Sequence, residues 1–382
     1  MSRTTPRVLV ASDKFKGSLT AAEVAAAVGA GVRRIRPDAV VESAPVADGG
    51  DGTLAAAEAA GFVLAPVTVT GPTGAPVRTS YARRGNVAVV ELADTSGLVR
   101  LPGGPDPMRA SSRGAGEALA AAVDAGCRRL VLGIGGSAST DGGAGLLRGL
   151  GARLLAADGE EIADGGAGLA RVARLDLTGL RSRLAGVELI VACDVDNPLT
   201  GPRGAAAVYG PQKGADDVQV RLLDGALSHW ADVVAASTGA DVRDNPGAGA
   251  AGGVGFAALA LLGAELRSGI ELVLELVDFE RRLDGADLVV TGEGALDEQT
   301  LHGKAPAGVA AAAARAGIPV VAVCGVNRLD DGRLRRAGIG TAYALLDLEP
   351  DLHRCLTGGA ALLERLGERI AAEHLALTKE TA

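Results

Sequence analysis

The fold is decided near the N-terminus by the stretch Val8-Leu-Val-Ala-Ser-Asp-Lys-Phe-Lys-Gly-Ser-Leu-Thr-Ala-Ala-Glu23. Its first four residues, Val8 to Ala11, are apolar and indicate a buried strand. Thr20 and Glu23 have the spacing of a capping box, which predicts a helix that ends before Pro37. A strand, a short loop and a helix in this order form the first half of a βαβ unit.

The rest of the chain repeats this alternation at its two ends and interrupts it in the middle. Near the C-terminus we expect strands at 287–291, 320–323 and 341–344 and helices at 306–316 and 360–373. The middle begins with β-rich alternation at 67–70, 77–81 and 87–91 and continues with helices at 114–125, 218–236 and 253–266 and strands at 130–132 and 189–192. Neither end alone has enough strands for a covered parallel sheet. We therefore expect an α/β fold with two domains, one formed by 1–66 together with 283–382, and a mixed α/β domain inserted at 67–282.

Composition excludes several classes of protein. The chain has 382 residues, a formal net charge of −8 and only 2% aromatic residues, which leaves no basic face or stacking platform for nucleic acid. The four cysteines contain no C-x-x-C pair, so structural zinc and disulfides are not expected. The longest uncharged stretch, 245–264, is dominated by Gly and Ala, and we expect no membrane span. No apolar segment of a secretory signal opens the chain, which favours a cytoplasmic protein.

Lysine is rare and unevenly placed. The chain has five lysines against thirty-three arginines, and four of the five lie in short stretches rich in Gly or Asp: Lys14, Lys16, Lys213 and Lys304. An ammonium group is a compact point charge with three donors, which suits phosphate and carboxylate oxygens. The pattern favours an anion site over chance placement in an Arg-rich composition.

The clearest loop is Gly133-Ile-Gly-Gly-Ser-Ala-Ser-Thr-Asp-Gly-Gly-Ala-Gly145, between an apolar strand and a helical pattern. Glycines let backbone N–H groups approach an anion, and the following helix N-terminus adds its dipole. Gly133-x-Gly135-x-x-Ala138 with Asp158 further on also matches a relaxed dinucleotide fingerprint. Tight turns and helix–sheet packing are the structural alternative.

Acidic residues follow several of the expected strands: Asp48, Asp51, Asp141, Asp194, Asp196, Glu293 and Asp297. The carboxyl ends of strands form the ligand crevice of α/β sheets, and Mg²⁺ uses a few carboxylates when phosphates supply its other ligands. Each Asp could instead cap a helix or a turn. Lys and Asp near glycine loops are the groups that phosphoryl transfer needs, although neither the Walker pattern nor the protein-kinase loops occur.

Taken together, these stretches resemble the type I glycerate kinase family over essentially the whole chain. The matching segments are Asp13-Lys-Phe-Lys-Gly-Ser18, Ala47-Asp-Gly-Gly-Asp-Gly-Thr53, Gly133 to Gly145, Asp194-Val-Asp-Asn-Pro-Leu199, Gly210-Pro-Gln-Lys-Gly214, Gly247 to Gly255 and Thr291 to Lys304. The resemblance implies a Rossmann-like parallel-sheet domain interrupted by a second domain. It also implies ATP- and Mg²⁺-dependent phosphorylation of D-glycerate, with 2-phosphoglycerate as the product in bacterial members.

Within this frame, residue chemistry suggests roles for the candidate residues. Asp194 is the candidate base, and Lys14 and Lys16 would bind anionic oxygens of glycerate or of the transferring phosphoryl group. Nucleotide binding is expected from Gly135, Gly136, Ser137, Asp141, Lys213, Glu293, Asp297 and Lys304. Asp196 and Asp48 would hold Mg²⁺.

Two other functions stay open at this point. An NAD-dependent hydroxy-acid oxidoreductase would explain the glycine loop but leaves the lysine-bearing loops unused. A non-catalytic sensor of small anions would explain two domains but predicts no release of ADP. Besides D-glycerate and ATP, a second copy of the chain in a homodimer is an open partner.

Overall fold

A computed structural model describes residues 5–301 and 303–375, which form two compact units. The first contains the chain up to Asp48, Ala55–Ala60 and the chain from Ile270 onward. The second contains Gly49–Leu54 and Gly61–Gly269. The residues at which the chain passes from one unit to the other differ from the expected domain boundaries at 66/67 and 282/283. The reason is that the strand from Val63 pairs over its whole length inside the second unit, and the helices from 269 to 283 pack in the first.

The first unit has a five-stranded parallel sheet in the order β13-β12-β11-β1-β2. The strands are β1 (Arg7–Ser12), β2 (Val40–Ser43), β11 (Leu288–Leu296), β12 (Val320–Asn327) and β13 (Thr341–Ala344). β1 lies beside β11, with Val8 opposite Leu288 and Ser12 opposite Gly292. The C-terminal part of the chain therefore completes the sheet that the N-terminal stretch begins.

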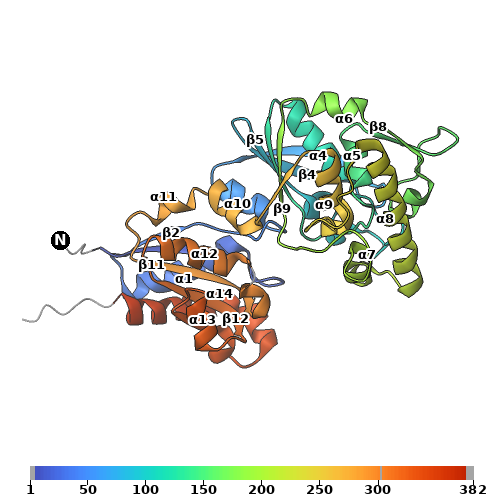
Figure 1. The fold of residues 1–382 in the computed structure, drawn as a ribbon. Helices are drawn as coiled ribbons and strands as arrows, with labels where there is room; N and C mark the ends of the chain where they lie inside the picture. Colours follow the sequence, from blue (N-terminus) through green and yellow to red (C-terminus); the bar gives the residue numbers. More distant parts are fainter. Residues whose placement is uncertain (1–4, 302, 376–382) are drawn as a thin grey trace, which may run out of the picture. The chain divides into compact units, whose positions relative to one another are not determined.

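Helices cover both faces of this sheet, because successive strand residues point to opposite sides. Val8 and Val10 pack on α1 (Ala21–Ile35) and α14 (Leu352–His374), whereas Leu9 and Ala11 lie in the core formed with the other helices. Those helices, labelled in part in Figure 1, are α2 (Thr53–Ala59), α10 (Gly269–Leu276), α11 (Phe279–Leu283), α12 (Ala305–Arg315) and α13 (Asp331–Arg336). The predicted capping box is confirmed, since the Glu23 N–H donates to Thr20 Oγ1.

The second unit has a six-stranded mixed sheet in the order β10-β9-β6-β5-β4-β3. Its strands are β3 (Val63–Thr70), β4 (Pro76–Arg84), β5 (Val87–Glu91), β6 (Arg129–Gly133), β9 (Glu188–Ala192) and β10 (Glu265–Arg267). β3, β4 and β5 are antiparallel, and β5, β6, β9 and β10 are parallel. β7 (Arg153–Leu155) and β8 (Arg174–Asp176) form a separate two-stranded sheet.

One hydrophobic core unites the helices of the second unit with its sheet. The helices are α3 (Leu92–Ser96), α4 (Arg113–Asp124), α5 (Ala144–Gly149), α6 (Thr178–Arg183), α7 (Ala205–Tyr209), α8 (Asp217–Thr238) and α9 (Ala250–Leu261) (Figure 1). Trp230, the only tryptophan of the sequence, is fully buried and meets Phe256 edge to face. Among the residues described, no helix is long and apolar enough to cross a membrane.

The predicted α/β fold with a parallel and a mixed sheet is confirmed, and two element assignments are wrong. The helix expected at 253–266 ends at Leu261, because Glu265–Arg267 pair with β9 as strand β10. The last helix begins at Leu352 rather than 360, where the Asp351 side chain accepts from the Arg354 N–H as its cap.

Candidate functional site

In the first unit, charged residues gather where β1 ends beside β11. The register places Ser12 opposite Gly292, so Asp13 follows the end of β1 while Glu293 is the next residue within β11, and the Asp13 N–H donates to the Gly292 carbonyl at 2.9 Å. Lys14 Nζ lies 3.7 Å from Asp13 Oδ1. Lys304 Nζ lies 3.8 Å from Glu293 Oε2. The parallel pairing thus brings together two cations and two carboxylates that are about 280 residues apart in sequence.

Glu293 is the most deeply placed of these groups, with 9% of its surface exposed. Burial raises its pKa, and the charges of Asp13 and Asp297 act in the same direction. The hydroxyl of Thr300, which donates to Glu293 Oε1 at 2.5 Å, and the ammonium of Lys304 oppose this rise. The Lys304 charge therefore partly offsets the rise in the pKa of Glu293 that burial causes.

The other candidates of this unit are placed less specifically. Asp297 caps the turn Glu298–Leu301, since its carboxylate accepts from the Gln299 N–H at 2.9 Å. Lys16 is exposed, with its backbone close to Gly294 of β11, and Asp48 is half-buried at the end of the first segment. Asp297 therefore has the turn-capping role that the sequence left open, and Lys16 keeps a solvent-facing ammonium near the strand ends.

In the second unit, the glycine loop that follows β6 packs directly on the loop 49–53. A Cβ at Gly135 would lie 2.6 Å from Gly50 Cα, and one at Gly133 would lie 2.5 Å from the Gly49 carbonyl oxygen. Only glycine allows this approach of two backbones. Glu91, at the end of β5, fixes the same loop by accepting the N–H of Leu54 at 3.1 Å. Burial raises the pKa of Glu91 to about 7.

The segment Gly135, Gly136 and Ser137 offers backbone donors. Neighbouring groups are paired, because the Gly136 carbonyl accepts from Leu98 and the Ala138 N–H donates to Ser96. Within the described part of the chain, no hydrogen bond uses the N–H groups of residues 135, 136 and 137. Gly136 has a φ of 72°, which directs successive N–H groups toward one side, as in anion-binding turns.

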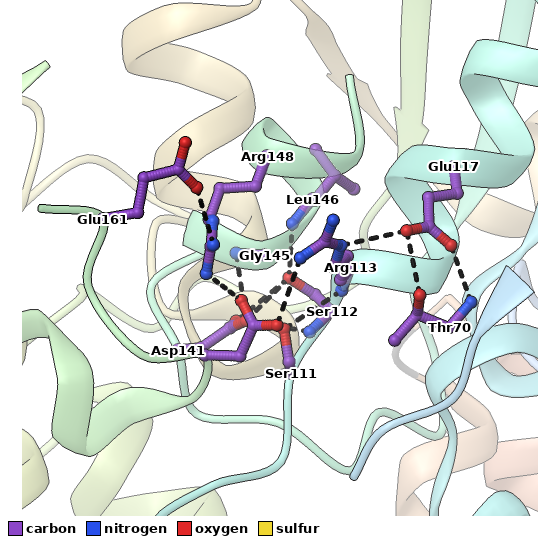
Figure 2. A network of polar contacts seen from close by, with 11 residues as sticks. Thr70, Ser111, Ser112, Arg113, Glu117, Asp141, Gly145, Leu146, Arg148 and Glu161 are labelled. Carbon is purple, nitrogen blue, oxygen red and sulfur yellow. Dashed lines mark hydrogen bonds and ion pairs between the residues drawn. The ribbon is translucent and has the colours of Figure 1, made fainter. Parts of the chain in front are cut away.

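Asp141 has a different position from the one a phosphate ligand needs, as Figure 2 shows. Its carboxylate is fully buried and accepts the N–H groups of Ser112, Gly143 and Gly145 at 2.8, 3.2 and 3.2 Å. The hydroxyls of Ser111 and Ser112 donate to it as well. Asp141 thus caps the N-termini of both α4 and α5. Its carboxylate occupies the positive end of the helix dipole at which the sequence suggested a phosphate.

The polar network of Figure 2 extends from this cap to the edge of the sheet. Arg113 donates to Glu117 at 2.9 Å, and Glu117 accepts from the Thr70 N–H at 2.6 Å. On the other side, Arg148 pairs with Glu161 at 3.0 Å. The cap of the glycine loop is therefore tied to β3 and to the loop before the short helix η2 (Gly166–Arg171).

Lys213 lies beneath the same loop. Its side chain is 2% exposed, and Nζ donates to Ser137 Oγ at 2.8 Å and to the Ser139 carbonyl at 2.5 Å. Burial lowers its pKa from 10.5 to about 7, and the charge of Asp141 opposes the change. The lysine thus contacts the loop from its buried side.

Two further acidic candidates follow β9. Asp194 is exposed, and its carboxylate accepts the N–H of Gly269 at 2.9 Å. Asp196 is also exposed and lies 3.3 Å from Arg203. An ion pair that solvent reaches contributes about 0–1 kcal/mol, so Asp196 can exchange Arg203 for a ligand.

The candidates thus fall into two groups. Lys14, Lys16, Asp48, Glu293, Asp297 and Lys304 belong to the first unit, and Gly135, Gly136, Ser137, Asp141, Asp194, Asp196 and Lys213 belong to the second. The sequence interpretation missed Asp13, Glu91 and Ser112 as partners. Asp13 directly follows a strand and Glu91 ends one, the same signal that identified the other acids, whereas nothing in the sequence indicated Ser112.

The chain is similar to several known proteins. Residues 8–375 match the model of the glycerate kinase family. A glycerate kinase of Bacillus subtilis (strain 168) is 45% identical over 370 residues, which cover 96% of this chain and 97% of the relative. The glycerate 2-kinase of Escherichia coli (strain K12) is 43% identical with the same coverage.

A solved structure shows the same fold. It is a crystal structure from Salmonella typhimurium LT2 of a protein with the provisional name glycerate kinase 2. The TM-score is 0.84 at 42% identity, with 97% of this chain and 98% of that chain covered. Since both the family model and these relatives span nearly the whole sequence, this chain belongs to the glycerate kinase family of phosphotransferases.

Proposed function

We propose that this enzyme transfers the γ-phosphoryl group of ATP, with Mg²⁺, to D-glycerate and forms 2-phosphoglycerate. The observation that carries the proposal is the group of Asp13, Lys14, Glu293 and Lys304, where β1 ends beside β11. Phosphoryl transfer depends on positioning and on neutralising charge, and paired ammonium groups beside carboxylates supply both. The name of the Escherichia coli relative, glycerate 2-kinase, supports the 2-phosphate as the product.

In this proposal Lys14 and Lys16 bind the carboxylate of glycerate and the transferring phosphoryl group. Lys304 pairs with Glu293 beside the end of β1, and its charge lowers the pKa of that carboxyl group against the effect of burial. Asp194 accepts the proton of the attacking hydroxyl, because it is exposed and follows the end of β9. The proton leaves the hydroxyl oxygen as that oxygen forms its bond to phosphorus.

The phosphates of ATP would bind at Gly135, Gly136 and Ser137. The N–H groups of this segment have no partner within the described residues, and Gly136 has the left-handed conformation of an anion-binding turn. Asp141 and Lys213 support this segment from the protein interior rather than contacting phosphate.

The residues present fit a Mg²⁺ ion of the kind kinases use. In residues 5–301 and 303–375 no group of three or more His, Cys, Asp or Glu side chains could hold a metal alone. Mg²⁺ bound with a nucleotide needs only one or two carboxylates, because phosphates and water supply its other ligands. Asp196, which is exposed and only weakly paired, and Asp48 are the proposed ligands. The ion would neutralise charge on the β- and γ-phosphates.

The oxidoreductase alternative is less compatible with the structure. A dinucleotide fingerprint needs its acidic residue at the end of the next strand of the same sheet. Asp158 instead lies exposed beside the separate β7–β8 sheet and pairs with Arg171. Because ATP is an intracellular donor, we infer a cytoplasmic reaction, and a homodimer remains our proposal for the assembly.

A substitution of Lys16 by methionine tests the proposed substrate site. We expect kcat/KM for glycerate to fall about 10²- to 10³-fold, since a charge that stabilises the transition state is lost. The fold should be intact, because the side chain is exposed. Arg171→Met, which removes an exposed cation far from the strand ends in sequence, is the matched control and should retain wild-type kinetics. Near-normal kinetics of Lys16→Met would remove this residue from the site.

A further inference from the structure

Lys213 is an unusual residue to find inside a protein. It is the second largest fully buried side chain of the described residues, after Trp230. Removing an ammonium from water costs several kcal/mol, so a lysine is retained in such a place only when other interactions offset that cost. A leucine or methionine of similar size would fill the same space. The packing alone therefore does not explain why lysine stands here.

The backbone around Lys213 is tightly fixed. It ends the short helix η3 (Pro211–Lys213), and its N–H donates to the Gly210 carbonyl at 2.9 Å. Gly214 follows with a φ of 88°, and a Cβ there would lie 2.4 Å from Pro105. The helix α8 then starts with a complete capping box at Asp216. This turn holds the lysine stem in one direction, toward the glycine loop.

The end of the side chain makes two bonds to that loop. Nζ donates to the hydroxyl oxygen of Ser137 and to the carbonyl oxygen of Ser139. Two N–H donors suffice for both bonds, so they form whether Lys213 is protonated or neutral. A hydroxyl oxygen that accepts from Nζ keeps its own hydrogen for donation to another acceptor. Lys213 thereby fixes which way the Ser137 hydroxyl points.

We infer that Lys213 is a positioning residue, which acts through Ser137 to direct the hydroxyl hydrogen of that serine at a phosphate of the nucleotide. The inference rests on the proposed function, in that the phosphates bind at residues 135–137. Lys213 itself does not touch the nucleotide, because its side chain is buried on the far side of the loop.

A double-mutant cycle with a matched control tests this role. Lys213→Met and Ser137→Ala are made singly and together, and Ser139→Ala is combined with Lys213→Met in parallel. Among the described residues, Ser139 Oγ has no hydrogen-bond partner, and only the Ser139 carbonyl contacts Lys213. Ser139→Ala therefore changes the same loop without removing a bond to the lysine.

Nucleotide affinity can be read directly from the protein. Trp230, the only tryptophan, donates its ring N–H to the Gly142 carbonyl of the glycine loop at 3.0 Å. Its fluorescence on titration with Mg-ATP gives a dissociation constant, and steady-state kinetics give KM and kcat separately. Thermal melting of each variant shows whether a loss of binding accompanies a loss of stability.

We expect Lys213→Met and Ser137→Ala each to weaken ATP binding and to raise its KM roughly 10- to 100-fold, with a much smaller change in kcat. The double variant should bind about as weakly as the weaker single variant, because both changes remove the same interaction. Ser139→Ala and Lys213→Met should instead combine additively. Melting temperatures should stay near that of the wild type, since a methionine fills the buried space.

Four results would overturn the inference. The first is wild-type ATP affinity in a folded Lys213→Met variant, and the second is full additivity of the effects of Lys213→Met and Ser137→Ala on that affinity. The third is wild-type affinity of Ser137→Ala alone, which decides the matter even where Lys213→Met fails to fold, and the fourth is a wild-type protein that binds no ATP. A wild-type protein that binds ATP but does not phosphorylate glycerate would refute only the proposed function.

Discussion

Replacing Asp141 with alanine should destabilise the second unit severely. The change leaves three backbone N–H groups, those of Ser112, Gly143 and Gly145, without an acceptor in a fully buried place. Each unsatisfied buried group costs about 1–3 kcal/mol, and some relaxation is expected. We therefore expect a loss of roughly 3–5 kcal/mol, which is a large part of the stability of a typical domain.

Urea unfolding followed by Trp230 fluorescence measures this loss, because the indole N–H is bonded to Gly142, next to Asp141. Asp158→Ala is the control, since that carboxylate is exposed and its partners are exposed Arg171 and the N–H of exposed Glu160, and it should change the stability by less than about 1 kcal/mol. A loss below about 1 kcal/mol for Asp141→Ala, together with loss of ATP binding, would refute the capping role and restore Asp141 as a phosphate ligand.

Four other changes have predictable outcomes. The pKa of Glu91 is raised from 4.5 to about 7, so its contribution to stability is complete below pH 4.5 and is lost as the pH rises through 7. At about 1.4 kcal/mol per pH unit, Glu91→Gln should gain up to roughly 3 kcal/mol relative to the wild type between pH 4.5 and pH 8, and parallel urea curves at both pH values check this. Gly252→Ala should cost at least about 2 kcal/mol in the same unfolding assay, because its Cβ would lie 2.1 Å from a carbonyl oxygen. Ala251 has a φ of 51°, in the left-handed region that favours glycine, so Ala251→Gly should change the stability by less than about 1 kcal/mol. A large loss of stability would contradict this backbone conformation. Lys304→Met should lower kcat at least tenfold and raise the pKa of Glu293, which the pH dependence of kcat/KM measures. An unchanged pH profile would show that Lys304 does not influence the ionisation of Glu293.

Local signals in the sequence predicted much of the fold because they have local physical causes. The capping box at Thr20 and Glu23 and the apolar strand before it depend only on near neighbours. The return of the C-terminal strands to β1 followed from the number of strands that a covered parallel sheet needs. Residues 265 and 266 were wrongly predicted as helix, since the strand conformation of Glu265–Arg267 depends on pairing with β9, more than 70 residues earlier.

The roles of single residues were harder to predict. An Asp beside glycine is typical both of a ligand and of a cap, and Asp141 proved to be a cap because α4 places Ser112 beside it. Lys213 was expected at a phosphate, and only its burial under Ser137 and Ser139 shows that it contacts the loop from inside. Such outcomes depend on distant segments of the chain, which no local pattern records.

The most direct test of the proposed reaction is product analysis by NMR after incubation of the pure protein with Mg-ATP and D-glycerate. We predict ADP and 2-phosphoglycerate in equal amounts, and no phosphorylated product when glycerate is omitted. Absence of ADP release, or instead an increase in reduced-nicotinamide absorbance when NAD and glycerate are supplied, would contradict the account.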